Sequence, residues 1–267
     1  MIEYITCNIA GPGDGLYNFG LGNQLFNVAA LISNAHDNNL IATFSQIKTP
    51  QYGGYDKNIM SRVNSEDVDT SNFRYIELPF GYHILPKEGN IYYKGYMQSE
   101  KYFMHNRQLI LDTLAPTEEV KDYINNKYGD LLKDNLMSMH IRRGDYVHLP
   151  NHHPTVSPTY HIAATEYITN REAVDGYVVF SDDIEWCKQT FGNEQDITYI
   201  EGEEDYIDMY LMSMCKHNII ANSTFSWWGA WLNQNPDKIV VAPNQWFGPA
   251  RSDLNTDDLI PETWIKL

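Results

Sequence analysis

Short apolar runs alternate with amphipathic stretches through the second half of the chain. The short runs predict buried strands, whereas apolar residues that recur every three or four positions predict helices. In one such helix Ile207, Tyr210 and Leu211 lie at i, i+3 and i+4 and form an apolar stripe. The predicted order is strand 136–141, helix 158–171, strand 176–181, helix 183–191, strand 197–200, helix 203–215, strand 218–221, helix 226–234 and strand 238–242. This alternation predicts an α/β fold with a parallel, doubly wound sheet.

The first half of the chain shows a similar but less regular pattern. It predicts strands at 2–9, 40–44, 75–78 and 91–96 and helices at 23–37, 99–112 and 117–128. The polar region 45–72 has no repeating pattern and is typical of a long surface excursion or lid. We therefore expect two lobes, formed by residues 1–132 and 133–267, with a C-terminal tail that can pack back on the first lobe.

The composition limits the classes of partner. A chain of 267 residues can bury the core of one large α/β domain or of two small halves. Its net charge of -16 repels nucleic acids and anionic membrane surfaces, so an anionic ligand needs a local basic pocket. No apolar stretch approaches the length of a membrane span, and the three cysteines lack metal-binding spacing. We expect a cytoplasmic protein; peripheral membrane association and the oligomeric state stay open.

The strongest candidate chemistry lies in residues 136–146, where an apolar strand ends in two arginines and a turn. Because side chains alternate along a strand, His140 and Arg142 should point one way and Arg143 the other. A guanidinium forks onto phosphate or carboxylate oxygens, so this strand end is suited to an anion. The alternative is a structural salt bridge between Asp145 and one of the arginines.

Two further polar segments, residues 180–183 and 222–226, also follow predicted strands directly. The carboxyl ends of parallel strands form the ligand crevice of an open sheet, so the three segments are expected to converge. The hydroxyl and N–H groups of 222–226 can hold a phosphate at a helix start, although a simple helix cap is the alternative. Asp182 is predicted to cap the helix that begins near Ile184 rather than to take part in catalysis.

Other candidates are weaker when they are taken alone. Asp208 lies at the margin of an apolar helix stripe, where it can accept hydrogen bonds from a guanine edge, but a solvated helix charge is the simpler explanation. A glycine-rich turn precedes Asn23 and Gln24, and its amides can approach a phosphate, although it matches no dinucleotide or Walker motif. Trp227 and Trp228 are predicted to be core residues first.

Together these segments resemble glycosyltransferase family 11, the α-1,2-fucosyltransferases. The matching stretches, in the family's order, are residues 20–26, 95–99 with 102–103, 140–146, 180–183 and 221–232. The resemblance implies a galactoside 2-α-L-fucosyltransferase of the GT-B type, with two Rossmann-like lobes facing a cleft. Such an enzyme inverts the anomeric centre as it moves L-fucose from GDP-β-L-fucose to the 2-hydroxyl of a terminal galactoside. It serves glycan or O-antigen-type synthesis and needs no obligatory metal or other cofactor.

The resemblance also implies residue roles. Arg142 would grip the β-phosphate with His140 beside it, and Asp145 is the nearest carboxylate that could accept the acceptor proton. Pairing with an arginine would make Asp145 a poor base, so a structural role is favoured. The predicted donor-binding residues are Gly22, Asn23, Gln24, Arg143, Asp182, Asp208, Ser223, Thr224, Phe225 and Ser226.

Two alternatives belong to other classes of protein. Asp67 and Asp69 form a D-x-D pattern that could hold a divalent ion in a metal-dependent sugar-nucleotide transferase, although a solvated surface is favoured for this polar region. A non-catalytic glycan-binding protein could use the 19 tyrosines and six tryptophans as stacking sites. That function has no use for Arg142 beside a helix start.

Overall fold

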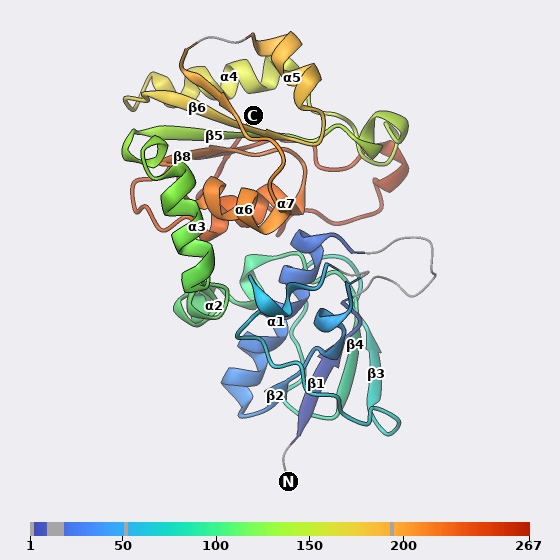
Figure 1. Cartoon of the computed structure of the whole chain (residues 1–267). Helices are drawn as coiled ribbons and strands as arrows, with labels where there is room; N and C mark the ends of the chain where they lie inside the picture. The colour runs from blue at the N-terminus through green and yellow to red at the C-terminus, as the bar shows by residue number, and fades with distance from the viewer. Residues whose placement is uncertain (1–2, 10–18, 51–52, 193–194) are drawn as a thin grey trace. The chain divides into compact units, whose positions relative to one another are not determined.

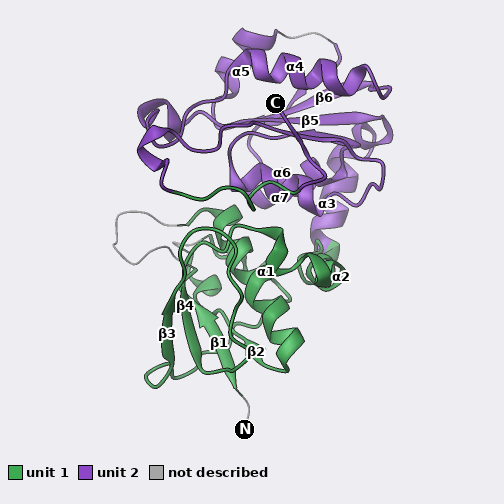
Figure 2. Cartoon of the chain, turned by 180° about the vertical axis from the view of Figure 1, so that it is seen from behind, with its two compact units in different colours: residues 1–118, 254–261 green, residues 119–253, 262–267 purple. Residues whose placement is uncertain are grey.

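The computed structural model describes residues 3–9, 19–50, 53–192 and 195–267. The chain divides into two compact units (Figure 2). Unit 1 consists of Met1–Glu118 and Leu254–Pro261, and unit 2 of Glu119–Asp253 and Glu262–Leu267. No helix in the described part of the chain has both the length and the apolar character needed to cross a bilayer.

Unit 2 is a parallel α/β sheet covered on both faces. Its strands are β5 (Leu136–Ile141), β6 (Gly176–Ser181), β7 (Ile197–Tyr199), β8 (His217–Ile219), β9 (Val240–Ala242) and β10 (Ile265–Lys266). They lie in the order β10-β9-β8-β5-β6-β7, and every neighbouring pair is parallel. The helices are α3 (Glu118–Tyr128), α4 (Pro158–Thr169), α5 (Ile184–Phe191), α6 (Asp205–Met214) and α7 (Thr224–Leu232). Helices α4 and α5 cover one face of the sheet, and α6 and α7 cover the other (Figure 1).

Strand β5 is buried along its whole length, as expected for a central strand of a parallel sheet that is covered on both faces. Met137, Met139 and Ile141 alternate along it and pack in one apolar cluster with Ala164 and Ile168 of α4. Fully burying one such side chain typically stabilises a fold by roughly 1.5–3 kcal/mol. The apolar run that predicted this strand therefore marks the centre of the unit.

The opposite face of the sheet is packed by the tryptophans of α7. Trp227 and Trp228 are completely buried, which confirms that they are core residues. Their rings meet edge to face with centroids 5.3 Å apart. Under the same face the Asn218 side chain donates a hydrogen bond of 2.7 Å to Ser138 Oγ of β5, so this buried polar pair is satisfied.

Unit 1 contains a smaller parallel sheet. Its strands are β1 (Tyr4–Cys7), β2 (Ile41–Ala42), β3 (Arg74–Glu77) and β4 (Ile91–Lys94), in the order β2-β1-β4-β3, and its helices are α1 (Leu21–Asn38) and α2 (Arg107–Thr113). Helix α1 ends at Asn39, whose left-handed backbone (φ 56°) satisfies a helix carbonyl through its N–H.

Two expectations about elements need correction, and one element was not predicted. The helix predicted over 99–112 begins only at Arg107, because Ser99 caps a short 3-10 turn and Phe103 (φ -142°) swings its ring into the core. The region 45–72 is not merely a surface excursion, since Ile47 and Ile59 within it are completely buried. The short strand β10 was not anticipated.

Candidate functional site

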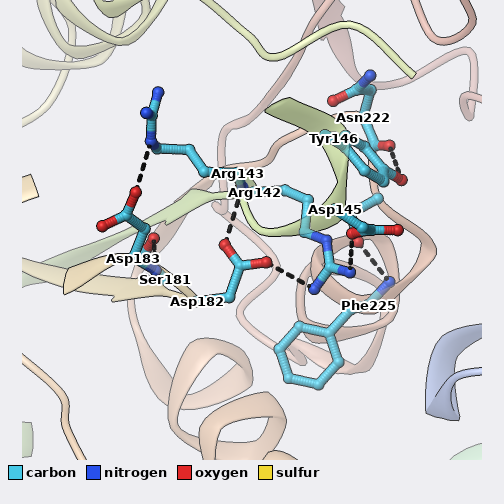
Figure 3. Close-up of polar contacts among 10 residues, drawn as sticks. Arg142, Arg143, Asp145, Tyr146, Ser181, Asp182, Asp183, Asn222 and Phe225 are labelled. Atoms are coloured by element: carbon cyan, nitrogen blue, oxygen red, sulfur yellow. Dashed lines mark hydrogen bonds and ion pairs between the residues drawn. The ribbon is translucent and has the colours of Figure 1, made fainter. Parts of the chain in front are cut away.

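Arg142 and Arg143 leave the end of β5 and engage different carboxylates (Figure 3). Arg142 Nη2 lies 2.6 Å from Asp145 Oδ1, and its Nη1 lies 2.9 Å from Asp182 Oδ2. Arg143 Nε instead pairs with Asp183 Oδ2 at 3.0 Å. The two arginine side chains therefore belong to separate ion pairs, in agreement with the prediction that they point in different directions.

Arg143 is the more enclosed of the two arginines. Its guanidinium lies over the Trp186 ring, 3.8 Å from the ring centroid, while its Nε holds Asp183 at the start of α5. Stacking on an indole and pairing with a carboxylate hold this guanidinium in place. The geometry gives Arg143 a structural task, and its contact with the donor stays a prediction.

Asp182 does not cap α5, contrary to the prediction. Helix α5 begins at Ile184, so the capping position falls to Asp183, whose side chain accepts the Trp186 N–H at 3.3 Å. Asp182 turns instead toward β5, where it accepts the Arg143 backbone N–H at 2.8 Å and pairs with Arg142.

Strand register explains this contact. Ile141 pairs with Ser181 at the ends of β5 and β6, so Arg142 and Asp182 leave the sheet side by side. Gly144 is needed next to them, because a Cβ at that position would collide with the Asp182 carboxylate.

The turn that opens α7 uses two of its hydroxyl groups to start the helix. Ser223 Oγ accepts the Phe225 N–H at 3.4 Å, and Ser226 Oγ donates to Ser223 O at 3.3 Å. Asn222 donates to the carbonyls of Pro154 and Trp246, while its own buried Oδ1 has no partner among the described residues. The capping alternative thus holds for Ser223, and its phosphate contact stays a prediction.

Tyr146 joins the arginine to this turn. The Arg142 Cζ atom lies 5.3 Å from the centroid of the Tyr146 ring, and the Tyr146 hydroxyl donates to Asn222 O at 3.3 Å. Burial raises the pKa of Tyr146 to about 12, so the hydroxyl stays a donor at neutral pH. Sequence reasoning missed this residue, although its place directly after Asp145 in the motif was a signal.

His140 lies on β5 close to the same turn. Its ring centroid is 5.5 Å from that of Phe225, and its Nδ1 is buried without a partner in the described part of the chain. Burial and the nearby Arg142 charge lower the pKa of His140 to about 3. The imidazole is therefore neutral at physiological pH and can offer a hydrogen bond but no charge.

Asp208, on α6, is not a solvated helix charge. One carboxylate oxygen is buried without a partner among the described residues. Burial, together with the charges of Glu203 and Asp205, raises the pKa of Asp208 to about 7. Glu203 in turn accepts hydrogen bonds from Tyr123 and Tyr128 of α3. A half-buried carboxylate with a raised pKa is a typical feature of a binding site.

The remaining predicted site residues lie in unit 1, in the first turn of α1. Gly22 is buried there, and Gln24 donates to Phe19 O at 2.8 Å. Asn23 Oδ1 accepts a hydrogen bond of 2.9 Å from Gln98 Nε2, and Gln98 is itself buried. The glycines at positions 11, 13 and 15 of the preceding turn fall outside the described residues.

The D-x-D pattern lies in an irregular segment that leads into a turn at residues 71–72. Asp69 accepts the Ser71 backbone N–H at 2.9 Å, and this hydrogen bond lowers its pKa. Among the residues that the structure describes, no three His, Cys, Asp or Glu side chains are grouped so that they could hold one metal ion.

A sequence model described as "Glycosyl transferase family 11" matches residues 17–267. The chain belongs to this family. It is 37% identical over 188 residues to an alpha-1,2-colitosyltransferase of Escherichia coli, covering 67% of this chain and 63% of the relative. It is 28% identical over 280 residues to a galactoside 2-alpha-L-fucosyltransferase of Caenorhabditis elegans, covering 94% and 78%. The chain thus spans less than two thirds of the bacterial relative's length.

The fold of this family 11 chain is similar to that of the fucosyltransferase NodZ from Bradyrhizobium. The TM-score is 0.58 at 13% identity, and the match covers 86% of this chain and 93% of that one. Such low identity supports the fold alone. The predicted fold class, two Rossmann-like α/β lobes of the GT-B type, is confirmed.

The family segments of unit 2 all lie at the carboxyl ends of its strands. Residues 140–146 include the end of β5 and the turn after it, residues 180–183 include the end of β6, and residues 221–232 follow β8. The ion pair from Arg142 to Asp182 links the first two segments, and the hydrogen bond from Tyr146 to Asn222 links the first and third. In this family member, one strand-end site therefore brings together three distant parts of the chain.

Proposed function

We propose that this chain transfers L-fucose from GDP-β-L-fucose to the 2-hydroxyl of a terminal galactoside, with inversion, in glycan or O-antigen-type synthesis. Membership of family 11 supports the proposal, as do the two relatives, which are named for α-1,2-colitosyl and galactoside 2-α-L-fucosyl transfer. The observation that carries it is the placement of Arg142 beside the turn that opens α7, to which Tyr146 connects it.

The chemistry of the transfer explains why an arginine is needed at this place. The acceptor oxygen attacks the anomeric carbon on the face opposite the diphosphate, the bond from that carbon to the phosphate oxygen breaks, and its electron pair leaves with GDP. Positive charge develops on the sugar ring and negative charge on the leaving group. Arg142 and the N–H groups at the start of α7 stabilise that negative charge, and one such donor is typically worth about 3 to 4 kcal/mol.

His140 supports this step without carrying charge. With a pKa of about 3 it is neutral at physiological pH and does not act as a general acid there. Its buried Nδ1 has no partner among the described residues, so it is left to hydrogen-bond a ligand. The acceptor proton goes to Asp145 or to water, and Asp145→Asn separates the two: a loss of turnover with intact folding and GDP binding identifies Asp145 as the base.

The nucleobase is assigned to Asp208. An ionised carboxylate can accept hydrogen bonds from both the N1–H and the 2-amino group of guanine. Because its pKa is raised to about 7, Asp208 is partly protonated near neutral pH. The two guanine donors favour the ionised carboxylate, so GDP binding releases a proton. Adenine lacks this pair of donors, so the assignment predicts selection for guanine.

The acceptor is assigned to unit 1, where neutral aromatic and amide groups follow β4. After β4, the Tyr96 ring lies 5.0 Å from that of Phe19 and 6.0 Å from that of Phe80. Two residues further along is Gln98, which holds the Asn23 amide, so Asn23, predicted as a donor contact, is here assigned to the acceptor. Aromatic rings and amides are the groups that recognise a galactoside through its apolar face and its hydroxyls.

Transfer of labelled fucose from GDP-fucose to lactose and other galactosides tests the proposal, with product linkage determined by nuclear magnetic resonance. An α-1,2-linked product supports it, and the absence of transfer to any galactoside contradicts it. The same assay with a chelator tests the metal-independent mechanism that we propose. The metal-dependent alternative predicts that a chelator abolishes turnover and that a divalent ion restores it. In an Asp67→Ala variant the divalent ion should then fail to restore turnover.

A further inference from the structure

The two carboxylates that share Arg142 are held very differently. Asp182 accepts both Arg142 Nη1 and the Arg143 backbone N–H, is 26% exposed, and lies against Gly144. Among the described residues Asp145 pairs with Arg142 Nη2 alone; it lies in a short 3-10 turn and is 55% exposed (Figure 3). Asp182 is thus held in place by the fold, whereas Asp145 is a largely solvent-exposed partner of the guanidinium.

The charges of this group conflict with an anionic ligand. One guanidinium and two carboxylates sum to a net charge of -1 around Arg142. A diphosphate brings at least two more negative charges and needs the same N–H donors. Like charges in close contact repel strongly at a partly exposed site, so a diphosphate and both carboxylates cannot share this guanidinium favourably.

We propose that binding of the nucleoside diphosphate exchanges Asp145 for a phosphate oxygen on Arg142, while Asp182 stays bound and positions the guanidinium. The Nη2 N–H groups turn from Asp145 Oδ1 to the phosphate, and the Asp145 carboxylate moves into solvent. This inference rests on the proposed function, since it takes the Arg142 site as the diphosphate site. Asp145 is then a competitor of the ligand, and Asp182 is a positioning residue.

The exchange predicts opposite effects for two substitutions of the same kind. Asp145→Asn removes the competing charge at nearly constant volume, so GDP should bind on the order of fivefold more tightly, the upper end for an exposed ion pair. Asp182→Asn loosens the guanidinium, so GDP should bind about tenfold more weakly, as expected for a more enclosed charged hydrogen bond.

Three probes identify the part of the ligand that matters. Calorimetry should show that Asp145→Asn binds GDP and inorganic pyrophosphate more tightly and that Asp182→Asn binds both more weakly. The affinity for guanosine, which carries no phosphate, should not change in either variant. A merely structural role of either aspartate would alter guanosine binding as well. Asp237→Asn, which removes an exposed carboxylate of the same unit, controls for the change in net charge and should leave all three affinities near those of the wild type.

Affinity for GDP that is unchanged or weaker in Asp145→Asn overturns the exchange, whatever Asp182→Asn shows. If Asp182→Asn does not fold, as judged by circular dichroism, Asp182→Glu keeps the charge but displaces it by one methylene and should weaken GDP binding in the same direction. Arg142→Ala tests the underlying assignment separately. A folded Arg142→Ala protein that binds GDP normally contradicts the proposed function. If Arg142→Ala loses GDP binding but Asp145→Asn does not bind GDP more tightly, the exchange alone is contradicted.

Discussion

The two units differ in the residues that follow their central parallel strands. In unit 2 the residues after β5 and β6 are charged and joined in ion pairs, as Arg142, Asp145 and Asp182 illustrate. In unit 1 the residues after β4 are aromatic and amide groups, among them Tyr96 and Gln98. Under the proposed function, the same type of sheet holds the anion in one unit and a neutral, hydroxyl-rich molecule in the other. The residues that follow the strands decide the ligand, and the fold decides only where these residues gather.

The largest expected effect tests the charged side. Arg142→Ala should lower fucosyl transfer by a factor of about 100 to 1,000, the usual consequence of losing one donor to a developing anion. Steady-state kinetics with GDP-fucose and a galactoside measure it. Arg171→Ala, which removes an exposed arginine stacked on Tyr167, is the control and should leave transfer unchanged. Near-normal turnover in folded Arg142→Ala protein would contradict the assignment of the anion site to unit 2.

The next effect is a pH dependence confined to unit 2. Because the pKa of Asp208 is raised to about 7 and only the ionised form accepts from guanine, GDP affinity should fall about tenfold per pH unit below 7 and level off above it. Calorimetry from pH 5.5 to 8.5 measures the profile. In Asp208→Asn the profile should flatten. A wild-type profile that is flat through pH 7 would show that this carboxylate does not meet the base.

Arg143→Ala separates the two neighbouring arginines. This substitution removes the contact with Trp186 and the ion pair with Asp183, so we expect a loss of stability of about 1 to 2 kcal/mol. Thermal unfolding measures it. GDP affinity of the folded protein should change far less than in Arg142→Ala. Equal losses of GDP affinity in the two variants would mean that both guanidinium groups serve the ligand.

The smallest effect belongs to the neutral side. Gln98→Ala removes the hydrogen bond that holds Asn23, so the KM for the galactoside should rise about fivefold, equivalent to about 1 kcal/mol for one neutral hydrogen bond. GDP affinity should stay the same. Gln108→Ala, at an exposed glutamine that bonds Asp112 on α2, serves as the matched control. A change in GDP affinity without a change in acceptor KM would reverse the assignment of unit 1.

Sequence patterns predicted the framework of unit 2 well, for a physical reason. Strands buried on both faces are nearly continuous apolar runs, so the predicted strands at 136–141 and 176–181 match β5 and β6. The pairing of Arg142 with Asp182 could not be predicted, because it depends on the register that sets Ile141 against Ser181.

Smaller features escaped prediction for local reasons. A helix start displaced by one residue moved the cap from Asp182 to Asp183 and gave each aspartate a different partner. The two-residue strand β10 is too short to show any alternation. In unit 1 the helix predicted over 99–112 failed because Phe103 breaks the turn to bury its ring, a tertiary effect that overrides helical spacing.

All six tryptophans of the chain fall within unit 2, and three of them, Trp227, Trp228 and Trp231, lie on the helix that starts at the proposed phosphate turn. Intrinsic indole fluorescence is thus a native optical reporter for that unit alone. A titration with nucleotide can be followed at the helix itself without any attached dye. On heating, emission that shifts at a different temperature from the far-ultraviolet dichroism of the whole chain would reveal that the two units melt independently.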